Sequence, residues 1–162
     1  MNIFWLDEDP WDAARLYCDR HVSKINVEIN QMISTALRRH GYNWDCLYEP
    51  VMENHPLVRW VGDSEQNFEE VVIHANALGD EFHHRYGSVH SSFADVTKEI
   101  GGREVNFPNL GLTERPQCMP QRFKVEGDYV KAYRRFYNHG KDWDMKWTSR
   151  EVPSWYTEGE LQ

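Results

Sequence analysis

The stretch 17–32 constrains the fold more than any other part of the chain, because it predicts one helix with two different faces. Apolar side chains recur at about 100° per residue along one face, as in a helix packed on a core: Cys18, Val22, Ile25, Ile29, Met32, Ile33 and Leu37. A second stripe beside it holds side chains that can transfer protons or orient a substrate: Tyr17, His21, Lys24, Glu28 and Gln31. Because this stripe borders the apolar face, we expect it to line a pocket at the edge of the core. The alternative is a solvated face, in which a Lys24–Glu28 pair stabilises the helix by about 0.3 kcal/mol.

Helix start and stop signals predict the boundaries of this central helix. Asp9 followed by Pro10 is typical of a helix start, because Asp caps free amides and Pro suits the first turn. We expect the helix to run to about Arg39 and to end before Gly41, with a break near Asp19 as the alternative.

Three further helices are predicted from the same signals, and they cover about 63–86, 91–100 and 128–139. Asp63 is the expected N-cap of the first, with Gln66 completing a capping box, and Gly87 is its expected end. The Pro- and Gly-rich segment 103–127 is expected to form a long loop, and such loops are often functional. The apolar lead, residues 2–6, is expected to pack on the body of the protein.

These elements predict an all-α protein with one domain, residues 1–162, and long loops. A chain of 162 residues is long enough to bury a core of its own. The sequence has no run of about eighteen apolar residues, so we expect no membrane span and no membrane partner. Three widely spaced cysteines and the lack of a signal-peptide pattern favour a reduced, cytoplasmic setting.

The charge is distributed unevenly along the chain. A net charge of −8 argues against strong non-specific binding to nucleic acid, which requires neutralised phosphates. Residues 115–150 nevertheless hold nine Lys and Arg against four Asp and Glu, a balance of +5. The basic, aromatic-rich segment 115–156 is therefore a candidate for binding an anionic ligand, and a mixed surface without a ligand is the alternative.

Motifs for metals, cofactors and nucleophilic side chains are weak. Cys18-x-x-His21 is a single half-site without a matching pair, so we predict no metal. The sequence has neither a phosphate-binding glycine loop nor a Gly-x-Ser-x-Gly motif, and we predict no cofactor. Cys18 lies on the apolar face, which favours an inert buried thiol.

Acid–base chemistry that involves an amine is better supported. Glu28 is the candidate catalytic carboxylate, with Lys24 and His21 one and two helical turns before it. If the reaction passes through a Schiff base, the amine is that of Lys24 or the α-amine of Met1. An α-amine has the lower ordinary pKa, about 8, so more of it is unprotonated at neutral pH.

Further side chains are candidates for binding a substrate, because they flank apolar faces or lie in the basic segment. Basic side chains are expected to hold phosphate, and aromatic rings are expected to stack a base. The full set is Tyr17, Gln31, His55, Asn67, His74, Arg134, Arg135, Tyr137 and Lys146.

The run Asp19-Arg20-His21, with Glu28 seven residues after the histidine, resembles the first helix of the pyrimidine-dimer DNA glycosylases of the phage endonuclease V type. The chain length and a closing Pro-x-Trp-Tyr at 153–156 are also similar. The chain also resembles a group of tailed-phage proteins, a resemblance that indicates no activity, in the runs 6–10, 18–28, 55–60, 85–87 and 124–139.

The glycosylase resemblance implies an endonuclease V-like helical architecture, with Glu28 as the catalytic carboxylate and His21 facing DNA. It also implies attack on the sugar C1′ by the N-terminal amine, strand cleavage by elimination, and a base extruded from the stack. The chain departs from that family because Asn2 is too large for the usual removal of Met, so the amine is expected to be that of Met1. No Arg occurs before Arg15.

We therefore expect a phage-encoded enzyme of the host cytoplasm that acts on a nucleobase of DNA or on its glycosidic bond, as in the repair of pyrimidine dimers. DNA is the expected partner. Two alternatives are also enzymes. One modifies a base without excising it, and the other acts on a small anionic nucleotide, which the net charge of −8 favours. A third is a non-enzymatic acidic phage protein that inhibits a host factor, although such a protein has no need of the polar stripe.

Overall fold

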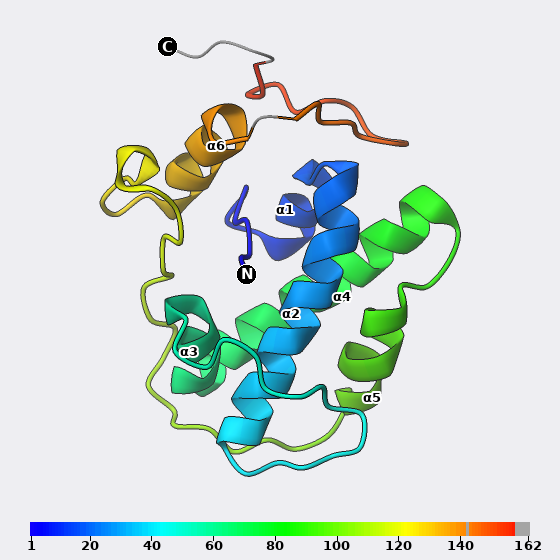
Figure 1. Ribbon diagram of the computed structural model, residues 1–162, viewed down its shortest axis with the longest axis vertical. Helices are drawn as coiled ribbons and strands as arrows, with labels where there is room; N and C mark the ends of the chain where they lie inside the picture. The colour runs from blue at the N-terminus through cyan, green and yellow to red at the C-terminus, as the bar shows by residue number, and fades with distance from the viewer. Residues whose placement is uncertain (142, 158–162) are drawn as a thin grey trace.

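The computed structural model describes residues 1–141 and 143–157, and six α-helices form the framework of this part of the chain (Figure 1). Their bounds are Pro10–Leu16 for α1, Asp19–Arg39 for α2, Pro56–Asp63 for α3, Glu65–Tyr86 for α4, Lys98–Ile100 for α5 and Tyr129–His139 for α6. A π-helical turn, Phe93–Thr97, leads into α5, and a 3-10 turn covers Gln121–Phe123. The described residues contain no strand, so the all-α prediction is confirmed.

The core lies where α2 crosses α4, and α1, α3 and the π-helical turn close it (Figure 1). The apolar stripe predicted on α2 is buried throughout, each side chain at most 1% exposed: Cys18, Val22, Ile25, Ile29, Met32, Ile33 and Leu37. Full burial of a large aliphatic side chain contributes about 1.5–3 kcal/mol. The stripe therefore fixes which face of α2 turns inward, and it leaves the neighbouring polar stripe at the edge of the core.

The predicted central helix is divided at Tyr17 and Cys18, both of which have extended backbone. The Cys18 amide donates to the Tyr137 hydroxyl (2.9 Å), and the Asp19 amide donates to the Lys146 carbonyl oxygen (2.8 Å). These partners satisfy amides that a continuous helix would bond internally. The alternative of a break near Asp19 is therefore correct, and segments distant in sequence fix its position.

The junction of α3 and α4 differs from the prediction by one residue. Asp63 is not an N-cap; it ends α3, and its carboxylate pairs with Arg39 (2.5 Å). Ser64 is the extended residue between the two helices, and its hydroxyl donates to the Gly111 carbonyl oxygen (2.7 Å). Gln66, the expected capping-box partner, bonds the long loop 103–127 instead, because its Oε1 accepts from the Gly111 amide (3.0 Å).

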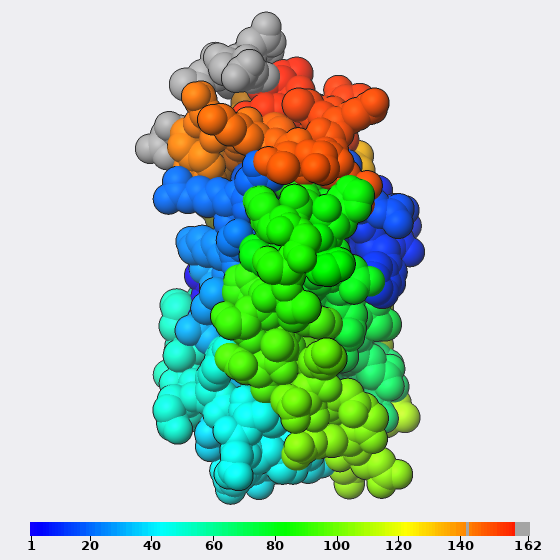
Figure 2. Space-filling model, turned by 90° about the vertical axis from the view of Figure 1, so that its right-hand side faces the viewer, coloured from blue at the N-terminus to red at the C-terminus, as the bar shows by residue number. Residues whose placement is uncertain are grey.

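Two other predicted helix boundaries are confirmed, whereas the predicted helix 91–100 is largely the π-helical turn Phe93–Thr97 that leads into α5. Gly87 ends α4 in the left-handed region with φ of 69°, and Asp128 caps α6 by accepting from the Lys131 amide (2.9 Å). Figure 2 shows one long side of the molecule, where α4, α5 and the turn before α5 (green) lie below the C-terminal segment (orange). Among the described residues, no helix combines the length and the apolar character that crossing a membrane requires.

The N-terminal segment 1–6 lies between α2 and α6 (Figure 1, dark blue). Its apolar side chains are at most 2% exposed: Ile3, Phe4, Trp5 and Leu6. The Phe4 amide donates to the Tyr17 hydroxyl (2.7 Å), which ties the segment to the break between α1 and α2. The packing of the apolar lead is therefore as predicted, and it brings the N-terminus to the side of α2.

Candidate functional site

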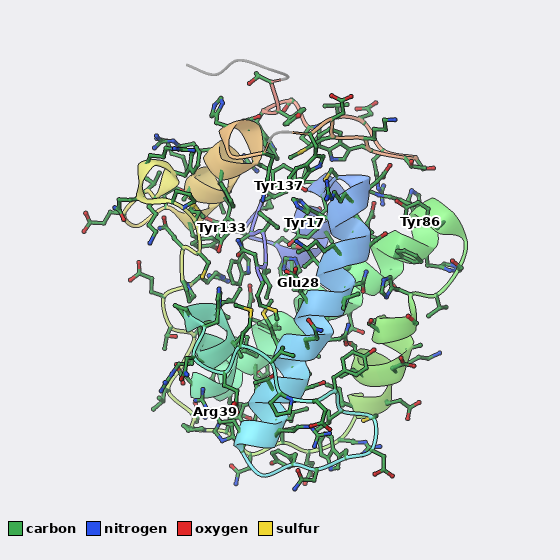
Figure 3. All side chains as sticks on the ribbon, viewed as in Figure 1. Tyr17, Glu28, Arg39, Tyr86, Tyr133 and Tyr137 are labelled. Atoms are coloured by element: carbon green, nitrogen blue, oxygen red, sulfur yellow. The ribbon has the colours of Figure 1, made fainter. Side chains whose placement is uncertain are left out.

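A pocket of about 230 Å³ lies where the N-terminal segment meets α2 and the end of α6. Figure 3 shows Glu28 on α2 and Tyr133 on α6 on opposite sides of that segment, whereas Tyr137 reaches from α6 toward the start of α2. Carboxylate, amine, guanidinium, imidazole and aromatic groups all line the pocket: Met1, Asn2, Phe4, Arg20, His21, Lys24, Ile25, Glu28, Phe136, Lys141 and Trp143.

The register of the N-terminal segment against α2 follows from the geometry of the two elements. Three extended residues advance about 10 Å, and seven helical residues advance about 10.5 Å. The Phe4 ring stacks on the His21 imidazole, with centroids 4.4 Å apart and planes 18° apart, and the Met1 amine lies beside Glu28. The spacing of His21, Lys24 and Glu28 turns all three toward this segment.

Glu28 holds the N-terminus through one carboxylate oxygen and Lys24 through the other. Its Oε2 lies 3.6 Å from the Met1 amine and accepts a hydrogen bond from the Asn2 backbone amide (2.9 Å). Its Oε1 lies 3.4 Å from Lys24 Nζ. The Met1 and Glu28 side chains are only 5% and 12% exposed, so water screens this pair less than it screens a surface ion pair.

The Asn2 side chain anchors the same segment from the other side. Its Nδ2 donates to the Cys118 carbonyl oxygen (2.9 Å), and its Oδ1 accepts from the Tyr133 hydroxyl (3.2 Å) and the Ile3 amide (3.0 Å). Tyr133 is fully buried on α6, and Cys118 belongs to the long loop. The position of the amine is thus set by α2, α6 and the loop together.

His21 is a neutral group in this pocket. Its Nδ1 lies 2.7 Å from the Tyr137 hydroxyl, and the residue is 2% exposed. Burial, together with the charges of Lys141, Lys24 and Arg20, lowers the pKa of His21 to about 3.

Lys141 and Arg20 contact the aromatic wall of the pocket. Lys141 Nζ lies 4.3 Å from the centroid of the Phe136 ring, 5.1 Å from that of Phe4 and 5.2 Å from that of Trp143. The Arg20 guanidinium lies 4.5 Å over the Trp143 ring. Each such cation–π contact contributes about 0.5–1 kcal/mol at an exposed site and more when shielded. Burial, together with the charge of Lys24, lowers the pKa of Lys141.

The pocket is positively charged although the protein has a net charge of −8. One carboxylate, that of Glu28, faces four cationic groups: the Met1 amine, Arg20, Lys24 and Lys141. A concave site lined by charges of one sign concentrates ligands of the opposite sign. The arrangement therefore suits an anionic ligand with a flat, stackable part.

The structure brings all four predicted catalytic groups into this pocket, namely Met1, His21, Lys24 and Glu28. It also shows lining residues that the sequence analysis did not select: Asn2, Phe4, Arg20, Phe136, Lys141 and Trp143. These come from segments more than a hundred residues apart, and no periodic pattern relates them. The apolar lead was the one signal for Phe4, and the Arg20 position within the Asp-x-His run was the one signal for Arg20.

Four of the nine predicted substrate-binding side chains lie in the core instead, namely Tyr17, Asn67, His74 and Tyr137. The Tyr17 hydroxyl bonds the Phe4 amide and His74 Nε2 (3.0 Å), and both residues are fully buried. Asn67 is also buried, and its Nδ2 donates to the Trp60 carbonyl oxygen (2.9 Å). Aromatic and polar residues at these helix positions face inward and satisfy buried groups, so they do not reach the pocket.

The predicted phosphate-binding residues are also placed elsewhere. Arg134 donates to the Leu6 carbonyl oxygen (2.8 Å) and pairs with Asp7 (3.2 Å), whereas Arg135 donates to the Arg122 carbonyl oxygen (3.2 Å). Lys146 is exposed on the C-terminal segment, away from the pocket lining.

Gln31, His55 and Tyr137 complete the predicted set. Gln31 is half-buried and lies outside the pocket lining. His55 caps α3, and burial and the charge of the Met1 amine lower the pKa of His55, which places it within electrostatic range of the site. Tyr137 is fully buried and contacts the pocket through His21.

Neither a metal cluster nor a known relative indicates the chemistry of this pocket. Across the part of the chain that the structure describes, no three His, Cys, Asp or Glu side chains are grouped as metal ligands. The cysteines are free thiols. Comparison of the chain with protein-family models, curated proteins and solved structures gives no match.

Proposed function

We propose that this protein is a DNA-processing enzyme that acts on the glycosidic bond of a nucleobase by glycosylase and lyase chemistry. The supporting observation is the Met1 amine 3.6 Å from the Glu28 carboxylate, inside a small, positively charged and aromatic pocket. An amine can form an imine with a sugar carbon, and a carboxylate beside it can accept and return protons.

The proposed reaction begins with attack of the unprotonated Met1 nitrogen on the sugar C1′. The bond between C1′ and the base breaks, and the base leaves with the electron pair and takes up a proton. Opening of the C1′–O4′ bond, with transfer of a proton from nitrogen to O4′, gives an imine between Met1 and C1′. Glu28 then removes a proton from C2′, and the C3′–O bond breaks with its electron pair on the departing phosphate. Water hydrolyses the imine and restores the amine.

The remaining pocket residues fit one extruded nucleotide. A pocket of about 230 Å³ has room for part of one nucleotide but not for stacked base pairs. The target must therefore leave the base stack before it reacts. Phe136 and Trp143 offer partly exposed rings for stacking, and Arg20, Lys24 and Lys141 offer charge for the flanking phosphates.

Borohydride reduction tests the proposal, because it converts an imine into a stable covalent bond. Intact mass spectrometry first establishes that the preparation begins with an unmodified Met1. Labelled duplexes with a thymine dimer, an abasic site or a modified pyrimidine are then incubated with the protein and borohydride, and the adduct is mapped. We expect an adduct at the Met1 nitrogen, with a yield at least about 100-fold lower for Glu28→Gln.

Three comparisons make this experiment decisive. Glu69→Gln, at an exposed glutamate of α4, should leave the yield unchanged. Acetylation of the N-terminus should abolish the adduct, whereas Lys24→Ala should retain it if Met1 is the nucleophile. An absence of adduct and of cleavage on every duplex would contradict the proposal.

An enzyme that acts on a small anionic nucleotide is the second candidate. The size of the pocket and the net charge of −8 of the whole chain favour it. In that case nucleoside monophosphates should bind, and duplex DNA should not bind even at low salt. A steep loss of duplex affinity with added salt would favour DNA instead.

A further inference from the structure

We infer that Tyr137 locks His21 as the neutral Nε2–H tautomer, so that His21 donates a hydrogen bond to a phosphate oxygen of the ligand. The inference deepens the proposed function and rests on it for the place where the ligand binds. It assigns His21 to holding an oxyanion, whereas the sequence placed it among side chains that transfer protons or orient a substrate. Tyr137 is then a positioning residue, because it acts on the ligand through His21.

The hydrogen-bond donors and acceptors around the Tyr137 hydroxyl determine the tautomer of His21. The Tyr137 oxygen accepts from the Cys18 amide (2.9 Å), and His21 Nδ1 lies 2.7 Å from it. Tyr137 is fully buried, and a buried hydroxyl proton needs an acceptor. The Cys18 thiol is the other group nearby, and sulfur is a weak acceptor. The hydroxyl therefore donates to Nδ1, and the proton of the neutral imidazole is on Nε2.

The groups around the His21 imidazole keep it neutral and leave its Nε2 edge available to a ligand. Phe4 stacks on one face of the imidazole, Tyr137 bonds Nδ1, and the Trp143 ring meets it at 5.5 Å and 89°. Among the described residues, none forms a hydrogen bond with Nε2, although His21 lines the pocket. The charges that act on the ring are those of Lys141, Lys24 and Arg20, and they oppose its protonation.

These same charges define the chemistry of the ligand atom. An N–H donor among three cationic side chains favours an anionic oxygen over a neutral carbonyl, because hydrogen bonds to charged acceptors are the stronger ones. The expected ligand group is therefore a phosphate oxyanion, which two kinds of ligand could supply. Its source is either the DNA phosphate that flanks the target nucleotide or the phosphate of a free sugar phosphate.

Nitrogen-15 NMR of the histidine rings tests the lock without any reaction on DNA. In the wild type we expect His21 to show a protonated Nε2 and an unprotonated Nδ1 at every pH from 5 to 8. Tyr137→Phe should give a mixture of tautomers, whereas Tyr133→Phe, an equally buried tyrosine one turn earlier on α6, should not. A protonated Nδ1 in the wild type would overturn the inference. If Tyr137→Phe does not fold, the wild-type spectrum alone decides.

Two substitutions of His21 test the ligand contact. Asn places its amide near the position of Nδ1, whereas Gln reaches the position of Nε2 and keeps a donor there. We expect His21→Asn to weaken binding of 2-deoxyribose 5-phosphate or of an abasic duplex by about tenfold or more, and His21→Gln to weaken it less. Equal affinities of wild type and His21→Asn would contradict the proposed hydrogen bond from His21 to the phosphate.

The two ligands separate the two sources of phosphate. Tight binding of the duplex assigns the oxyanion site to DNA, and binding of the sugar phosphate alone assigns it to a free ligand. Because the spectra require no imine, a failure of borohydride trapping and a failure of this inference are distinguishable.

Discussion

Asn2 contributes to the site in two ways at the scale of single residues. Its backbone amide bonds Glu28 (2.9 Å), and its side chain bonds Cys118 and Tyr133. Asn2→Leu keeps the size of the side chain, and so the retention of Met1, but removes the side-chain bonds. We expect the free energy of unfolding to fall by about 1–2 kcal/mol.

The effect of Asn2→Leu on the chemistry should be larger than its effect on stability. A misplaced amine no longer meets the sugar beside Glu28, so the yield of borohydride adduct should fall at least tenfold. Urea denaturation and adduct yield measure the two effects on one preparation. Asn54→Leu, in an exposed turn, is the control, and an unchanged adduct yield for Asn2→Leu would contradict the anchoring role.

Single residues also show how far sequence reasoning reaches into the site. Glu28, Lys24 and His21 were predictable because one helix relates them by a fixed period. Lys141 and Asn2 were not, because their place depends on how α6 and the N-terminal segment pack against α2. A periodic pattern within one element carries no information about a partner more than a hundred residues away.

At the scale of elements, α4 is joined to α2 and to the C-terminal segment by a buried ion network. The Arg85 side chain is 0% exposed and contacts Glu81 (2.7 Å) and Asp19 (3.0 Å), while Arg150 contacts the other Glu81 oxygen (2.8 Å). Glu81→Gln removes the charge that both guanidinium groups share. We expect a loss of about 3 kcal/mol in the free energy of unfolding, since an uncompensated buried charge is costly. Glu69→Gln, exposed on the same helix, should change it little.

The same network should make the free energy of unfolding depend on pH. Burial raises the pKa of Glu81, but the hydrogen bonds and charges of Arg150 and Arg85 outweigh it and hold that pKa below its usual value of 4.5. A lowered folded pKa gives stability that is complete above 4.5 and is lost as the pH falls through the folded pKa. The stability difference between wild type and Glu81→Gln should therefore shrink below about pH 4.5. Urea denaturation from pH 6 to 3 measures it, and a constant difference would contradict the role of the ion pairs.

Element boundaries illustrate what local signals miss. The start of α1 at Pro10 and the end of α4 at Gly87 depend on residues next to the boundary, and the sequence predicted both. The break at Tyr17 depends on a hydroxyl and a carbonyl from the last third of the chain, and the start of α4 depends on the long loop. Local signals therefore located helices well and tertiary junctions poorly.

For the whole molecule, the contrast between an acidic protein and a basic pocket predicts how the affinity for DNA depends on salt concentration. Each pocket cation that neutralises a phosphate should contribute about one unit to the slope of log affinity against log salt. Lys24→Gln and Lys141→Gln should each lower the slope by about one for an abasic duplex. Arg135→Gln should leave it unchanged, because this side chain lies outside the pocket and donates to a carbonyl oxygen. Equal slopes for Lys141→Gln and the wild type would place the phosphate elsewhere.

The stability of the whole molecule should also fall in mild acid, because His21 and His74 are buried as neutral groups. Burial, with a smaller effect of the Arg115 charge, lowers the pKa of His74 from 6.5 to about 3. Between these two values the unfolded chain binds more protons than the folded one, so acid favours unfolding. For His74 alone the loss from pH 7 to pH 5 is about 2 kcal/mol.

His74→Gln tests this prediction, because an amide oxygen near the position of Nε2 can still accept from the Tyr17 hydroxyl but takes up no proton. Between pH 7 and pH 5 the variant should lose about 2 kcal/mol less stability than the wild type. His83→Gln, at an exposed histidine of the same helix, should keep the wild-type dependence. If wild type and His74→Gln lose the same stability over this range, His74 is not the buried neutral group that its contact with Tyr17 indicates, and the remaining acid sensitivity must come from His21 and the ion network.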